Sequence, residues 1–206
     1  MSRFILTAAL VAAAAAPAAA QVTSSSNGEV APAAPVAAAP VLREPVAEMF
    51  TDAKIAGVAS VSNMSEIQPS QLALTKAQNA GVRQFAQRMI DEHVRLEQAM
   101  QAMLKQKGVT PEHNGYSYQV HQNLGPMLRE LNAASGRDFD RLYMSHQVGS
   151  HMATLHALDT SLIPQAKDPQ MKAMLQQQVR PAVADHYARA LALRDSVAAP
   201  AAGGAR

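Results

Sequence analysis

Between residues 80 and 107 the apolar positions recur about every 3.6 residues, which is the period of an α-helix. Arg83, Arg88 and Asp91 fall on the opposite side. Gly108 and Pro111 follow at positions typical of a helix end. The pattern predicts an amphipathic helix over 80–107 whose buried face carries Val82, Phe85, Ala86, Met89, Ile90, His93, Met100, Met103 and Leu104.

The rest of the chain between residues 46 and 197 has similar helical patterns and no strand-like alternation. Asp168 and Pro169 suit the N-cap and first turn of a helix, whereas Pro69 and Pro181 predict a kink, restart or interruption. Further helices are therefore expected over 46–77, 118–134, 136–161 and 168–197, of which 118–134 is the shorter one. These lengths predict an all-α fold, an antiparallel four-helix bundle with one short extra helix.

The first twenty residues have the organisation of a secretory signal peptide. Arg3 precedes an apolar run from Phe4 to Ala16, and Ala18 and Ala20 form a small-x-small cleavage pattern. The run is shorter than the roughly 20 residues that span a bilayer. The alternatives are an uncleaved anchor and an amphipathic surface helix. The pattern favours export, with no transmembrane segment left after cleavage.

The absence of cysteine narrows the destination of an exported chain. Without cysteine there is no disulfide, and the lipid anchor of bacterial lipoproteins has no attachment point. We therefore expect a soluble periplasmic or secreted protein. Its predicted organisation is a signal peptide over 1–20, a disordered Pro/Ala-rich linker over 21–45, a helical domain over 46–197 and a flexible tail over 198–206.

Charge and composition exclude some partners. The chain has 18 Lys and Arg against 16 Asp and Glu, without a basic run suited to phosphates, so nucleic acid is not an expected partner. Tryptophan is absent and aromatic residues make up 4%, which argues against a carbohydrate groove built on aromatic platforms. An envelope protein or a second copy of the chain stays open as a partner.

Short motifs follow one another in a recognisable order. They include Ser65-Glu66-Ile67, Val82-Arg83-Gln84-Phe85-Ala86-Gln87-Arg88-Met89-Ile90-Asp91-Glu92-His93, Phe139-Asp140-Arg141-Leu142-Tyr143, and Arg180-Pro181 ahead of His186. From about Glu48 to Asp195 the chain resembles a family of exported bacterial proteins in the ferritin-like superfamily, a domain of unknown function often labelled an outer membrane protein. The family usually has Asp-Asp-His at Asp91-Glu92-His93, and Leu-Pro at Arg180-Pro181. The resemblance implies a ferritin-like bundle with Glu, His, His and His at Glu66, His93, His151 and His186, and no established activity.

Three histidines fall on apolar faces of three different predicted helices, namely His93, His151 and His186. Inward-facing imidazoles from three helices can converge on one transition-metal ion such as zinc, copper, iron or nickel. Glu66 is a candidate fourth ligand, although on a straight helix it lies nearly opposite the stripe formed by Phe50, Val61, Met64 and Leu72. The alternative is that each histidine is a hydrogen-bonded core residue without a metal.

Other chemistry has less support. Di-iron carboxylate bundles use Glu-x-x-His motifs, and this chain has none. His146 is expected in the core or at a partner interface, whereas His113, His121 and His156 are expected in solvent. The 11 methionines also suit copper, but methionine at helical spacing is usually core packing.

No complete catalytic motif emerges, which favours a non-enzymatic role. The sequence therefore leaves two hypotheses: an envelope protein that binds a partner or acts in stress tolerance, and a metal-binding or redox bundle.

Overall fold

The computed structural model describes residues 49–198, which are helical apart from short connections and contain no strand. The all-helical class is thus confirmed for this part of the chain. The predicted signal peptide, linker and tail lie outside it, except that Ala198 is the first residue of the predicted tail. None of the described helices is long and apolar enough to cross a membrane. The helices are α1 Asp52–Lys76, α2 Ala80–Lys107, α3 Gly115–Ala133, α4 Gly136–Ala157, α5 Ile163–Gln165, α6 Pro169–Met174 and α7 Arg180–Ala198.

Two short π-helical segments join pairs of these helices into longer continuous helical stretches, called columns below. Segment η1, Leu158–Leu162, connects α4 to α5, and η2, Leu175–Val179, connects α6 to α7. Each segment ends two residues before a proline, Pro164 or Pro181. A proline has no N–H and collides with the carbonyl four residues earlier, and the wider π turn relieves both problems. The predicted interruption at Pro181 is therefore a π segment within a continuous column.

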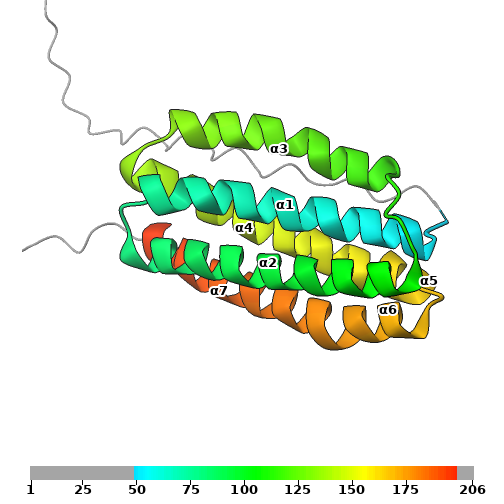
Figure 1. Ribbon diagram of the computed structural model, residues 1–206. Helices are drawn as coiled ribbons and strands as arrows, with labels where there is room; N and C mark the ends of the chain where they lie inside the picture. Colours follow the sequence, from blue (N-terminus) through cyan, green and yellow to red (C-terminus); the bar gives the residue numbers. More distant parts are fainter. Residues whose placement is uncertain (1–48, 199–206) are drawn as a thin grey trace, which may run out of the picture. The chain divides into compact units, whose positions relative to one another are not determined.

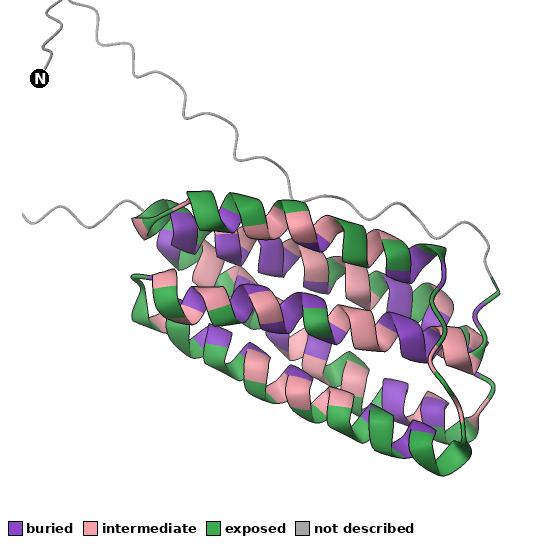
Figure 2. Cartoon of the chain, turned by 45° about the horizontal axis from the view of Figure 1, so that its top comes forward, coloured by how far each residue is buried: buried purple, intermediate pink, exposed green. Residues whose placement is uncertain are grey.

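The columns pack side by side, with α2 and α3 both lying along α1 and α4 lying along α7 (Figure 1). Additional contacts join α1 to α4, α2 to α7 and α3 to α4. Buried residues line the faces that the helices turn toward one another (Figure 2). Because α1 has neighbours on several sides, more of its circumference is buried than that of an ordinary amphipathic helix.

The helix ends agree with several local predictions. Helix α2 has the predicted bounds, and Gly108 caps it in the left-handed conformation at φ 65°. The Asp168 side chain accepts hydrogen bonds from the backbone N–H groups of Gln170 and Met171, as expected of an N-cap. Helix α1 runs through Pro69 without the predicted restart. Helix α3 starts earlier than expected, because Asn114 and Ser117 form a capping box.

Candidate metal centre

Three buried imidazoles meet in the interior of the helical domain. His93 comes from α2, His151 from α4 and His186 from α7, and they are 4%, 2% and 0% exposed. Their ring centroids lie 5.2 to 5.9 Å apart. One nitrogen of each ring lies within 4.8 Å of a nitrogen of the other two. The structure therefore brings together the three histidines that the sequence singled out.

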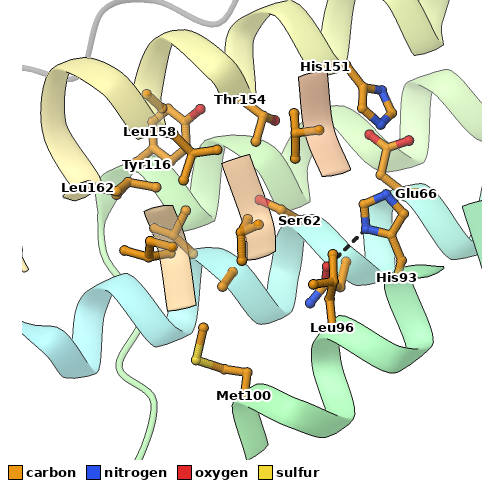
Figure 3. Close-up of a pocket in the computed structure, with 17 residues that line it drawn as sticks. Ser62, Glu66, His93, Leu96, Met100, Tyr116, His151, Thr154, Leu158 and Leu162 are labelled. Atoms are coloured by element: carbon orange, nitrogen blue, oxygen red, sulfur yellow. Dashed lines mark hydrogen bonds between the residues drawn. The ribbon is translucent and has the colours of Figure 1, made fainter. Parts of the chain in front are cut away.

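A chain of hydrogen bonds fixes the tautomer of His93. The Asn63 amide nitrogen donates to the Glu97 carboxylate at 2.8 Å, so the Asn63 oxygen must face the ring. That oxygen lies 3.0 Å from Nδ1 of His93, the contact dashed in Figure 3. Since an amide oxygen can only accept, Nδ1 carries the proton. Nε2 of His93 is left with a lone pair.

The other two rings are fixed in the same manner. Nδ1 of His151 lies 2.8 Å from the backbone carbonyl of Gln147. Nε2 of His186 lies 2.7 Å from a carboxylate oxygen of Glu92. Carbonyl and carboxylate oxygens accept, so both of these ring nitrogens donate. The lone pairs then reside on Nε2 of His151 and Nδ1 of His186.

These three lone-pair nitrogens have no hydrogen-bond partner among the described residues. They are His93 Nε2, His151 Nε2 and His186 Nδ1, all fully buried. A buried polar atom without a partner costs about 1–3 kcal/mol, and such atoms are rare in folded proteins. Three acceptors within 4.8 Å of one another, with no donor paired to them, form a site that favours a cation.

Burial favours the neutral form of His93 and His186. Loss of solvation lowers the pKa of His93 well below its usual value, and the neighbouring His151 and His186 lower it further. Burial also lowers the pKa of His186, although its hydrogen bond to Glu92 opposes the shift. A metal competes with a proton for each nitrogen, so a low pKa leaves the ligand atoms available at neutral pH.

Glu66 lies beside the histidines, against the expectation from the apolar stripe of its helix. It is only 7% exposed, whereas Met64 in the supposed buried stripe is 46% exposed. The carboxylate of Glu66 accepts a hydrogen bond from the Gln147 amide at 2.8 Å. Figure 3 shows this carboxylate near the rings of His93 and His151. Helix α1 buries several sides of its surface, so its apolar residues do not mark which way it faces.

A cavity opens beside the centre. Glu66, His93 and His151 line one end of it, and Tyr116, Leu158 and Leu162 line the other (Figure 3). Between them the walls are mostly apolar side chains from α1, α2, α4, α7 and both π segments, with Ser62, Asn63 and Thr154 as polar exceptions. The space open to the centre of a water molecule is about 40 Å³.

The remaining histidines lie elsewhere. His146 is buried on α4 but contacts Glu130 of α3 at 3.2 Å, outside the three-histidine cluster. Burial lowers the pKa of His146, while Glu130 partly opposes this shift. His113, His121 and His156 are exposed, as the sequence predicted.

The sequence analysis missed the residues that orient the imidazoles. Asn63 and Glu92 accept hydrogen bonds from the rings of His93 and His186. Gln147 accepts one from the His151 ring through its backbone carbonyl and donates one to Glu66 through its side-chain amide. One signal was present: Asn63, Glu66 and Ser70 form a polar stripe at helical spacing on a helix with apolar neighbours. Glu92 gave no such signal, because it is 94 residues from His186 in the chain.

Residues 31–193, most of the chain, match the model of a domain of unknown function, DUF4142. The match begins inside the segment predicted to be a linker. No curated protein and no solved structure matches the chain.

Proposed function

The chain belongs to the DUF4142 family, and we propose that it binds one transition-metal ion through His93, His151 and His186. The observation that carries this proposal is the set of three buried lone-pair nitrogens without a donor. Each ring also uses its second nitrogen to donate to an amide, carbonyl or carboxylate oxygen. Metal-binding histidines in proteins have this arrangement, in which the outer partner fixes the ring and raises its basicity.

The distances suit one ion. Ligands at tetrahedral angles around zinc, with bonds near 2.0 Å, lie about 3.3 Å apart. The nitrogens of this centre lie within 4.8 Å of one another, so small rotations of the rings bring them to bonding distance. Had the histidines served only as packed core residues, their inner nitrogens would be expected to pair with protein donors.

The donor set narrows the class of metal. Imidazole nitrogen with carboxylate oxygen suits zinc, copper, iron or nickel and disfavours magnesium and calcium. Glu66 is the fourth candidate ligand because its carboxylate lines the same cavity as His93 and His151. A di-iron carboxylate centre is not proposed, since α4 contains no glutamate and the chain has no Glu-x-x-His motif.

The fold and location belong to the same proposal. The packing of α1, α2, α4 and α7, with α3 alongside α1, supports an antiparallel four-helix bundle with one extra helix, of the ferritin-like kind. The N-terminal pattern supports work in the periplasm or outside the cell. The competing hypothesis is a metal-free envelope protein that binds a partner or acts in stress tolerance.

Metal analysis of protein purified from its native compartment tests the proposal. We expect inductively coupled plasma mass spectrometry to find close to one equivalent of a transition metal per chain. A His93→Ala variant should lose this metal. The control is His146→Ala, which removes another buried histidine that has a carboxylate partner and lies outside the centre. Circular dichroism of both variants checks that they remain helical.

Two results would overturn the metal-binding role. One is a native protein without metal that also fails to take up zinc, copper, iron or nickel after dialysis. The other is equal metal content in the wild type and the His93→Ala variant.

A further inference from the structure

The cavity beside the centre has a shape and lining that a metal ion alone does not explain. The ion would occupy the space between the three rings, whereas the cavity extends from His93 and His151 to Leu158 and Leu162 (Figure 3). Natural protein interiors are packed to nearly crystalline density, so voids larger than a water molecule are few. A void lined by His93 and His151, two of the three histidines with an unpartnered nitrogen, calls for a specific explanation.

Water does not fit the far part of this cavity. One water molecule needs about 10–15 Å³ of space open to its centre, so the 40 Å³ of this cavity has room for about three. A buried water also needs two to four polar partners, and the walls toward Leu158 and Leu162 offer only the hydroxyl of Tyr116. An apolar occupant loses nothing there and gains contact with the walls.

The two π-helical segments form this part of the wall. Leu158 and Leu162 belong to η1, and Leu175 and Val179 belong to η2. Twelve residues separate the two segments in the chain, and each segment contributes its first and last residue to the same cavity. A π turn changes the direction of the side chains around it and recurs at functional sites. The π segments that accommodate Pro164 and Pro181 thus also shape the apolar end of this cavity.

The net charge of the metal and its ligands indicates what kind of head group a ligand in the cavity would have. The Glu92 carboxylate, which bonds to His186 at 2.7 Å, is already paired with Arg88 at 2.9 Å. A divalent ion with three neutral imidazoles and the Glu66 carboxylate therefore retains one positive charge in a buried position. Such a charge is costly without a counter-charge. A monoanionic ligand head would neutralise the centre, and an apolar tail would occupy the cavity.

Resting on the metal-binding function above, we propose that the cavity binds a small monoanion with a short apolar tail, such as a short-chain carboxylate. The head ligates the metal held by His93 and His151, and the tail lies between the π segments. The available space corresponds to about three methylene groups, since a methylene and a liquid water molecule occupy similar volumes of about 30 Å³.

A chain-length series on the cobalt-loaded protein tests this assignment. The probes are acetate, propionate, butyrate, pentanoate and hexanoate, and the readout is the visible absorption of bound Co²⁺. Each methylene that enters an apolar cavity should tighten binding about fourfold. We expect this gain from acetate to butyrate, whose tail has three carbons, and no further gain for pentanoate or hexanoate.

An Ala157→Leu variant should abolish the trend, because Ala157 is 2% exposed and lines the cavity. The matched control is Ala102→Leu on the exposed side of α2, which should behave as the wild type. Cobalt content is measured first for all three proteins. If cobalt binds but affinity does not depend on chain length, or Ala157→Leu keeps the dependence, the cavity assignment is wrong and the metal site stands. If the wild type binds no cobalt, zinc, copper, iron or nickel, the metal site itself is wrong.

Discussion

The histidine centre and the layer formed by Tyr143, Phe139, Phe85 and Ser70 are both buried and both contain polar groups. They differ in whether those polar groups have hydrogen-bond partners. Tyr143 is fully buried, stacks on Phe139 at 6.2 Å and meets the edge of Phe85 at 6.3 Å. Its hydroxyl lies 2.8 Å from the Ser70 hydroxyl, which in turn donates to the Glu66 carbonyl at 2.6 Å. Burial raises the pKa of Tyr143, so the phenol stays neutral. This layer is complete without a ligand.

The histidine centre is incomplete by the same criterion. Each imidazole has one partner, and its other nitrogen has none. His151 and Tyr143 both lie on α4, two turns apart, so the helix itself does not cause the difference. The comparison indicates that a paired buried polar group supports the fold, whereas a converging unpaired set indicates a ligand.

The largest expected effect is on the stability gained from metal. Zinc at about a thousand times its dissociation constant should raise the free energy of unfolding by about 4 kcal/mol. A His186→Ala variant should lose this increment, because it removes one of the three ligands. Urea unfolding followed by circular dichroism, with and without zinc, measures the difference.

The Tyr143 layer supplies the control for that experiment. Tyr143→Phe removes the hydroxyl and should lower the free energy of unfolding by about 1 kcal/mol, while the increment from zinc is kept. Loss of the increment in Tyr143→Phe, or its survival in His186→Ala, would show that the two regions do not differ as described.

A smaller effect is expected from the residue that orients His93. Asn63→Ala removes the acceptor for Nδ1 and should weaken metal affinity by about 10- to 100-fold. Competition with a coloured chelator measures the dissociation constant. Ser65→Ala is the control, because Ser65 is buried on the same helix but bonds only to the Ser62 carbonyl. Equal losses in the two variants would mean that general damage to α1, and not the orientation of His93, is responsible.

The metal-free protein should also lose stability as the pH falls. The folded state lowers the pKa of His93 and His186, so the unfolded chain binds more protons below about pH 6.5. The contribution of these histidines to the free energy of unfolding is fully present above that pH. It falls as the pH drops, by up to about 1.4 kcal/mol per pH unit for each histidine. Urea midpoints between pH 7.5 and 5 measure this slope.

A His93→Gln variant should flatten that slope, since glutamine does not titrate. Saturating zinc should steepen the loss below pH 6, because protons then also displace the metal. A metal-free wild type with a flat profile from pH 7.5 to 5 would contradict the shifted pKa values.

The helices were predictable where one face alone is buried. In α2, eight of the nine positions predicted to face the core are buried, and Ile90 is half-buried. The ends at Gly108 and Asp168 were also predictable, because capping depends on residues close in the chain. The π segments could not be predicted from the sequence, because they depend on how the helices pack as well as on the prolines.

The candidate site was predictable in part for the same reason. His93 and His151 lie on apolar faces that the helical period reveals, and His186 was placed by the same pattern. Glu66 was misplaced because α1 contacts α2, α3 and α4, and its apolar stripe does not mark its only buried side. The partnership of Glu92 with His186 joins residues from different helices, and no local pattern contains it.

The sequence by itself determined the helices, their local caps and the three inward histidines, because these follow from periodicity and from neighbours within a few residues. Only the tertiary structure decided that the imidazoles meet, which tautomer each adopts, and that a cavity bounded by η1 and η2 opens beside them. The physical reason is that distances between helices are set by packing. Hydrogen-bond partners and voids appear only once the helices are packed together.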